Sequence, residues 1–307
     1  MKSGMFNKFK PLAAAALITC FVVILCGCET FGGFAGNGGQ AAQTGKDTIR
    51  IGRVVPLTGY LQDFGKGTPW VEEQAVKAVN DEGGIYIKEY NKKLKLEMVY
   101  ADSGSNPIKA AEAASRLILN DKVDILIASH TNDTVNPVSA TAERYNIPCV
   151  TVDAPSNAWL EGGPYKWSFH AFWLSNSQVS VYFDAFDLMP TNKRIGLLAP
   201  NDTEGISLAK VLIERAGERG YTVIDPGRFP VGTRDYTEII NKFKDENVEL
   251  VCGVMMPQDF SVAFRQMHQQ GFVPKMACVA KALLFPSSIQ ALGGDLPLGL
   301  MSEVWWS

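Results

Sequence analysis

The sequence lacks several features on which common classes of function depend. Its 307 residues contain 29 Lys and Arg against 32 Asp and Glu, a formal net charge of −3, so no basic excess favours a nucleic-acid partner. Only three histidines occur, and no H-E-x-x-H, G-x-S-x-G or P-loop motif is present. No G-x-G-x-x-G follows the first predicted strand, at residues 48–55, which argues against a dinucleotide site. We therefore expect neither an enzyme nor a cofactor.

Cysteine is scarce beyond the first 30 residues. Cys149, Cys252 and Cys278 each lie within a short apolar run, PCVTV, LVCGV and ACVA, which is typical of a buried strand. Their spacing fits no zinc pattern, so we predict no metal site. One disulfide among them stays open for an exported protein.

The first 46 residues predict export and a lipid anchor. Three lysines precede an apolar run at residues 12–26, which is shorter than the ~20 residues that a membrane span needs. The junction Leu25-Cys26-Gly27-Cys28 resembles a bacterial lipobox, with the small residue Gly27 directly before Cys28. We predict a lipoprotein signal peptide at residues 1–27, lipidation of Cys28, and a flexible Gly-rich tether at residues 28–46. The folded part is then expected outside the cytoplasmic membrane.

The stretch at residues 123–145 is the most informative in the chain. It begins as an apolar run that suits a strand buried in a parallel sheet, and it ends as an amphipathic helical pattern. Six polar residues join the two, and Asn132, Asp133 or Thr134 can cap the helix. Open α/β sheets bind ligands at such loops, and the amides of a helix N-terminus favour an anionic group.

Strand and helix patterns alternate along the remaining chain, which predicts an α/β fold of two doubly wound parallel-sheet lobes. We place the N-terminal lobe at residues 47–168, with a crossing between lobes at residues 167–172. The C-terminal lobe follows at residues 169–298, and residues 299–307 are predicted to begin an incomplete return crossing.

Several segments occur in an order typical of one family. They are PLTGYLQDFG, AVKAVNDEGGI, VYADSGSNPIKAAEAASRLI and VDILIASHTNDTVNPVSATAERYNIPCVT. From about Ile49 onward the chain resembles type I periplasmic binding proteins, and more narrowly the Leu/Ile/Val-binding branch that serves ABC importers. The resemblance implies two lobes joined by a hinge, with a ligand cleft between them. Because family members continue further, the chain resembles a C-terminally truncated member.

The same resemblance implies ligand contacts on loops of both lobes. They are Thr131, Asn132 and Asp133 after the third strand, Asp153, Ala154 and Pro155 after the fourth, Phe64 in the first loop, and Glu204 with Met255 or Met256 in the second lobe. The chain departs from the amino-acid binders at three of these places. HTND replaces a Ser/Thr-rich run, Asp153 replaces a small residue, and Ala280 stands where the family has the acidic residue that holds the ligand's ammonium.

Asp153 has two interpretations. It is a turn residue, or it is a carboxylate in a water-poor cleft, where it would need a cationic partner. In the second case Asn132 and Asp133 hold one polar end of the ligand and Asp153 holds the other. A zwitterionic or amine-bearing ligand meets both demands, and loss of Asp153 is expected to weaken binding by more than about tenfold.

Two functions remain open at this stage. The first is a lipid-anchored receptor that delivers a small polar organic solute, such as an amino acid or a related amine or carboxylate, to the permease of an ABC importer. The second is a ligand-sensing domain of the same fold in signalling. A hydrolase is a weaker third possibility, which any turnover of a bound ester or amide would revive. We expect the lipid to provide the only membrane contact, no nucleic-acid partner, and a monomer.

Overall fold

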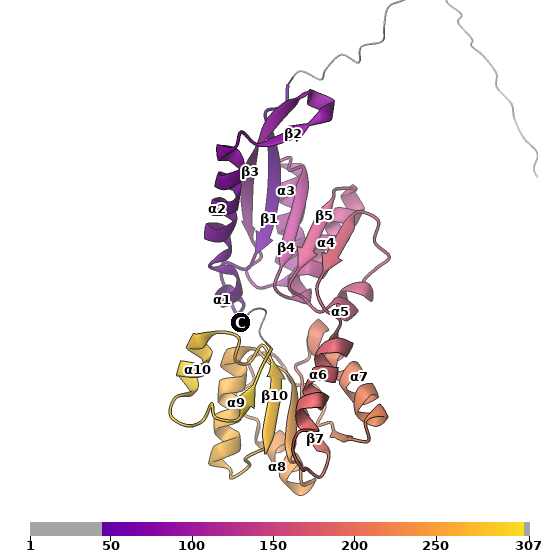
Figure 1. The fold of residues 1–307 in the computed structure, drawn as a ribbon, viewed down its shortest axis with the longest axis vertical. Coiled ribbons are helices and arrows are strands. Elements are labelled where there is room, and N and C mark those ends of the chain that lie inside the picture. Colours follow the sequence, from indigo (N-terminus) through magenta and orange to yellow (C-terminus); the bar gives the residue numbers. More distant parts are fainter. Residues whose placement is uncertain (1–44, 304–307) are drawn as a thin grey trace, which may run out of the picture. The chain divides into compact units, whose positions relative to one another are not determined.

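The computed structural model describes residues 45–303, which fall within one compact unit of the chain. The predicted leader, Cys28, nearly all of the tether and residues 304–307 lie outside the described residues. Strands and helices alternate through the described part, and the strands form two separate sheets (Figure 1). The predicted α/β fold of two parallel-sheet lobes is therefore confirmed.

The first lobe is built on a six-stranded sheet in the order β2-β3-β1-β4-β5-β6. Neighbouring strands are parallel except for the antiparallel pair of β2 and β3, which the sequence did not indicate. The strands are β1 (Thr48–Val55), β2 (Ile85–Ile87), β3 (Lys92–Asp102), β4 (Ile125–Ser129), β5 (Cys149–Val152) and β6 (Ser168–Ala171). The helices are α1 (Gln62–Gly65), α2 (Thr68–Asp81), α3 (Pro107–Leu119), α4 (Asn132–Tyr145) and α5 (Ser156–Leu160), with a 3-10 turn at Lys88–Tyr90.

The second lobe is built on a fully parallel sheet in the order β11-β10-β9-β7-β8. Its strands are β7 (Arg194–Leu198), β8 (Thr222–Ile224), β9 (Leu250–Val254), β10 (Met276–Ala280) and β11 (Leu300–Met301). Its helices are α6 (Ser175–Phe186), α7 (Thr203–Glu218), α8 (Thr237–Asp245), α9 (Pro257–Gln269) and α10 (Pro286–Leu292). Apolar clusters fill both faces of this sheet, as expected for strands such as LVCGV that are apolar throughout.

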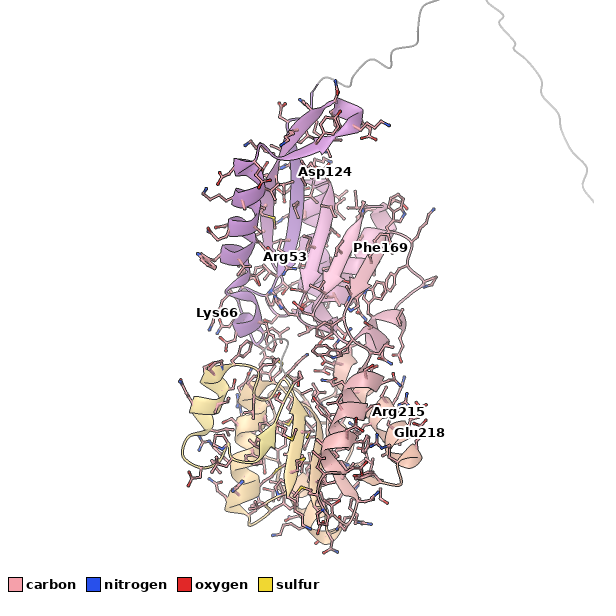
Figure 2. All side chains as sticks on the ribbon, in the orientation of Figure 1. Arg53, Lys66, Asp124, Phe169, Arg215 and Glu218 are labelled. Atoms are coloured by element: carbon pink, nitrogen blue, oxygen red, sulfur yellow. The ribbon has the colours of Figure 1, made fainter. Side chains whose placement is uncertain are left out.

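The two faces of the first sheet differ. On one face Val54, Leu126 and Ala128 pack against α3 and α4 in a buried cluster. On the other face α2 lies along β3 without a single buried residue. Val150 and Phe169 are 38% and 62% exposed. Figure 2 labels Phe169 on the sheet of the first lobe. Within the described residues, the first lobe therefore presents apolar sheet surface to solvent.

The segments that we predicted as crossings between lobes each contain a short strand that the sequence did not indicate. Ser168–Ala171 forms β6, which pairs with β5 at the edge of the first sheet, so the chain leaves the first lobe only after Ala171. Leu300–Met301 forms β11, which pairs with β10 in the second sheet. Both segments are short, and the edge strand beside each of them offers backbone hydrogen bonds that an irregular connection would lack.

Candidate ligand-binding cavity

The loop from β4 into α4 carries the residues predicted to bind ligand. The start of this loop is held by the buried Arg53 of β1. Its Nη2 donates to the Oγ of Ser129, the last residue of β4, at 2.6 Å, and its Nε lies 2.8 Å from Glu72 Oε1. The helix begins at Asn132, and Thr131 is the N-cap residue without a side-chain capping bond. The prediction of a cap at Asn132, Asp133 or Thr134 is wrong, because all three lie inside the first turn.

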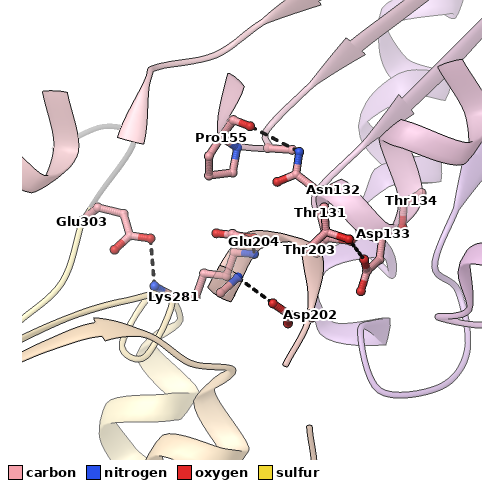
Figure 3. Close-up of polar contacts among 12 residues, drawn as sticks. Thr131, Asn132, Asp133, Thr134, Pro155, Asp202, Thr203, Glu204, Lys281 and Glu303 are labelled. Carbon is pink, nitrogen blue, oxygen red and sulfur yellow. Dashed lines mark hydrogen bonds and ion pairs between the residues drawn. The ribbon is translucent and has the colours of Figure 1, made fainter. Parts of the chain in front are cut away.

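Asn132 is 1% exposed and its orientation is fixed by its neighbours. Its Nδ2 donates to the Pro155 carbonyl at 3.2 Å and to Asn136 Oδ1 at 3.4 Å, while Asn136 Nδ2 donates to the Ala158 carbonyl at 2.9 Å. Backbone carbonyls only accept hydrogen bonds, so the atom of each side-chain amide that faces a carbonyl must be the nitrogen and the other must be the oxygen. Asn132 Oδ1 is left buried without a hydrogen-bond partner among the described residues, on the same side chain whose Nδ2 bonds the Pro155 carbonyl (Figure 3).

Asp153, Ala154 and Pro155 follow β5. The carboxylate of Asp153 is half-buried, with one oxygen 3.9 Å from His130 Nδ1. Burial raises its pKa, and the charges of Arg53 and His170 oppose that rise. Burial also lowers the pKa of His130 to about 3, so its imidazole is neutral at pH 7. Asp153 therefore has potential partners within the protein itself.

The second lobe contributes acidic groups from the start of α7. Asp202 is the N-cap residue and accepts from the Gly205 amide at 2.7 Å. Burial raises the pKa of Asp202, although that hydrogen bond and the charge of Lys281 act in the opposite direction. Asp133 accepts from Thr203 Oγ1 at 2.8 Å, which links α4 of the first lobe to α7 of the second.

Glu204 and Lys281 form an ion pair whose side chains are only 8% and 9% exposed. The Lys281 amide donates to Glu303 Oε1 at 2.8 Å (Figure 3). Burial alone would lower the pKa of Lys281, but Glu204, Asp202 and Glu303 together raise it above its ordinary value. Burial raises the pKa of Glu204 to about 7, against the attraction of Lys281. Lys281 is thus held as a cation among carboxylates.

Three strands end in the same unusual backbone conformation. His130, Asp153 and Lys281 directly follow β4, β5 and β10, with φ angles of 91°, 60° and 64°. Residues other than glycine rarely adopt a positive φ, because that backbone conformation costs of order 1 kcal/mol or more. Such strain collects at functional sites, and here it marks the carboxyl edges of both sheets.

A cavity of about 200 Å³ lies between these loops. Its lining residues come from both lobes: Tyr60, Leu61, Ser105, Thr131, Asn132, Asp133, Asp202, Glu204, Val231, Met256 and Lys281. Three of them are carboxylates and one is an ammonium, which Glu204 already neutralises. The lining therefore has a negative excess.

The structure brings five of the predicted site residues to this cavity: Thr131, Asn132, Asp133, Glu204 and Met256. Asp153 and Pro155 border a smaller neighbouring cavity, which also touches Glu204 and Lys281. Ala154 is buried and its carbonyl accepts from His170 Nε2 at 2.7 Å. Met255 belongs to the core of the second lobe. Phe64 packs edge-on against Phe285, with ring centroids 5.0 Å apart, in an apolar cluster with Leu61 and Met256.

Sequence reasoning missed six lining residues: Tyr60, Leu61, Ser105, Asp202, Val231 and Lys281. Asp202 and Lys281 follow the ends of β7 and β10, so the rule that parallel sheets bind ligands at the carboxyl ends of their strands could have found both. Val231 lies on a long loop and carries no such signal.

A family model described as "periplasmic binding protein" matches residues 48–306, which include almost all of the described chain. The chain belongs to the periplasmic binding protein family. The prediction of a type I member from the Leu/Ile/Val-binding branch is confirmed. Within residues 45–303 no helix combines the length and apolarity that a membrane crossing requires.

Individual relatives of this periplasmic binding protein are distant. Leu/Ile/Val-binding protein homolog 3 of Brucella melitensis biotype 1 is 24% identical over 238 residues, which cover 78% of this chain and 62% of that protein. The match thus spans less than two thirds of the relative's own length. A leucine-binding protein structure from Thermotoga maritima has a TM-score of 0.68 at 20% identity, covering 80% of this chain and 67% of that one. A solute-binding protein from R. palustris in complex with 4-hydroxybenzoate has a TM-score of 0.65 at 16% identity. That match covers 80% of this chain and 65% of the R. palustris chain.

Proposed function

We propose that this chain is the solute-binding component of an ABC importer and that its ligand is a small organic molecule carrying a protonated amine. The observation that carries the proposal is the side-chain carbonyl oxygen of Asn132, a residue that lines the cavity: this oxygen is buried without a donor among the described residues. A buried acceptor left unpaired costs free energy of about 1–3 kcal/mol. An ammonium group supplies three donors and a positive charge, and it would satisfy this oxygen.

The charges around the cavity support the same ligand class. Asp133 and Asp202 each accept one hydrogen bond from the protein, and neither forms an ion pair with a described residue. Lys281 is already paired with Glu204. A purely anionic ligand would add to the negative excess, whereas an ammonium would reduce it. The lining therefore favours a cationic or zwitterionic solute over a simple carboxylate.

The size of the cavity supports an amino acid or a molecule of similar dimensions. Its volume of about 200 Å³ lies below the ~300–1,000 Å³ of pockets for drug-sized ligands. The first turn of α4 borders the cavity, and helix N-termini favour anions, so a ligand carboxylate fits there. The relatives that are named for Leu, Ile and Val binding agree with this class, and the 4-hydroxybenzoate complex shows that the fold also serves other acids.

Asp153 keeps its predicted role only as a proposal. It borders the smaller cavity rather than the main one, and Arg53 and His170 already oppose its uncharged form. We therefore assign the ligand's amine to Asn132 and Asp202 before Asp153.

The experiment that tests the function is calorimetric titration of the purified chain with small amines and with their deaminated analogues. Binding of the amines is expected. Equal affinity for both members of each pair would contradict the proposed ligand class.

We further propose that the mature protein is a monomer held outside the cytoplasmic membrane by a lipid on Cys28, where it presents its ligand to a permease. The basic, apolar and lipobox-like segments of residues 1–28 support the anchor. A palmitate analogue is expected to label the wild-type protein and not the Cys28→Ala variant. Label that persists in that variant would remove Cys28 as the anchor.

A further inference from the structure

A buried carboxylate outside the cavity connects three of the segments that form its walls. Asp259 lies in the first turn of α9, in the second lobe, and is 2% exposed. Its Oδ2 accepts from the Gly232 amide at 2.8 Å and from the hydroxyl of Tyr60, which belongs to the first lobe. The Tyr60 carbonyl in turn accepts from Gln258 Nε2 at 3.1 Å. Two neighbouring residues of α9 thus bind the same residue of the opposite lobe.

Each segment held in this way reaches the cavity. Tyr60 lines it directly, Val231 lines it next to Gly232, and Met256 lines it as the N-cap residue of α9. Asp259 itself does not line the cavity. Its contacts therefore act on the position of the walls and not on the ligand.

The position of Asp259 in the first turn of α9 suits a carboxylate that accepts hydrogen bonds. The first turn of a helix stabilises a carboxylate through the helix dipole, and hydrogen bonds to an ionised group are about twice as strong as neutral ones. Separating the lobes would remove the Tyr60 hydroxyl from Asp259, which already has one buried oxygen, Oδ1, without a partner among the described residues. The contact therefore favours the arrangement in which the cavity exists.

We propose that Asp259 is a positioning residue that latches the two lobes through Tyr60 and thereby sets how long a ligand stays bound. The proposal rests on the proposed solute-binding function. In two-lobed receptors the ligand leaves when the lobes separate, so a weaker latch speeds dissociation. Association is affected little, because among variants of one site affinity changes fall mostly on the dissociation rate.

The test combines stopped-flow kinetics with a ligand-free measurement on the full mature chain. Asp259→Asn and Tyr60→Phe are each expected to raise the dissociation rate of the tightest-binding small amino acid about 10- to 100-fold, with the association rate within about threefold. The double variant is expected to match the larger single effect, because both substitutions remove one shared contact. Lys210→Met is the matched control, since it breaks an exposed ion pair between α7 and Glu161, and it should change neither rate.

A second readout keeps the proposal testable if no probe amino acid binds. Fluorophores placed at the exposed Ile108 of the first lobe and Leu298 of the second report lobe separation without ligand. Both latch variants are expected to shift this distance towards a more open form, with unchanged thermal unfolding in Tyr60→Phe. Fully additive kinetic effects, or an unchanged distance, would overturn the latch. Failure of the wild type to bind any amine would overturn only the proposed function.

Discussion

Replacing Lys281 with methionine is expected to lower the free energy of unfolding by about 3–5 kcal/mol, because Glu204 would be left as a buried charge without a partner. The pair is more than 90% buried on both sides, so water cannot take over the role of the lost ammonium. Chemical denaturation of wild type and variant measures the difference. An exposed pair gives the matched control: Lys77→Met removes the partner of Asp81 on α2 and should cost less than about 1 kcal/mol.

The double variant Glu204→Leu/Lys281→Met shows how much stability is lost when the whole ion pair is replaced, as opposed to when one charge is left without its partner. Replacing both ends with apolar side chains is expected to restore most of the stability, since a buried ion pair and a packed apolar pair are often nearly equal. A double variant as unstable as Lys281→Met would contradict this account.

The destabilisation by Lys281→Met should also depend on pH. Burial raises the pKa of Glu204 above its ordinary value of 4.5, and a carboxyl with a raised folded-state pKa loses stability as pH rises. Without Lys281 that loss is no longer opposed. The cost is therefore expected to be small near pH 4.5 and to increase towards pH 8, and the opposite trend would refute the assignment.

Asp202→Asn is expected to weaken binding of an amine-bearing ligand by about 30- to 5,000-fold, which corresponds to the 2–5 kcal/mol typical for removing one partner of a desolvated charge pair. Asparagine caps helices as well as aspartate does, so the hydrogen bond to the Gly205 amide and the start of α7 are preserved. The variant thus changes the charge at the cavity and leaves the fold intact. Calorimetry gives the affinity, and unchanged thermal unfolding serves as the control.

A second variant tests whether ligand affinity depends on the position of the carboxylate or only on its charge. Asp153→Asn removes a carboxylate of the same charge from the neighbouring small cavity. We expect its effect on affinity to be smaller than that of Asp202→Asn. The reverse ranking would restore the sequence-based assignment of the ligand's amine to Asp153.

The repeated strand and helix patterns were sufficient to predict both sheets, because short apolar runs such as residues 123–128 suit buried parallel strands where they alternate with amphipathic helical patterns. They were not sufficient for Ser168–Ala171 and Leu300–Met301. Whether so short a segment forms a strand depends on a free edge beside it, and that is a tertiary property.

The candidate site was predictable where ligand loops follow strands, as at Asn132. It was not predictable for contacts that cross between lobes, such as Asp133 with Thr203 or Tyr60 with Asp259. These pairs lie 70 and 199 residues apart, and no local pattern indicates which polar side chains will meet. The unpaired oxygen of Asn132 likewise depends on Pro155 and Asn136 occupying its other end.

The most direct test of the central claim is calorimetric titration of the wild-type protein with alanine, valine and leucine, each beside its 2-hydroxy acid analogue. The members of a pair differ in one group, an ammonium or a hydroxyl, so their affinity ratio reports on the donor that Asn132 and Asp202 are proposed to receive. The account predicts that at least one amino acid binds, and does so at least about 30-fold more tightly than its analogue. Equal affinities within every pair, or tight binding of 4-hydroxybenzoate without binding of any amine, would contradict it.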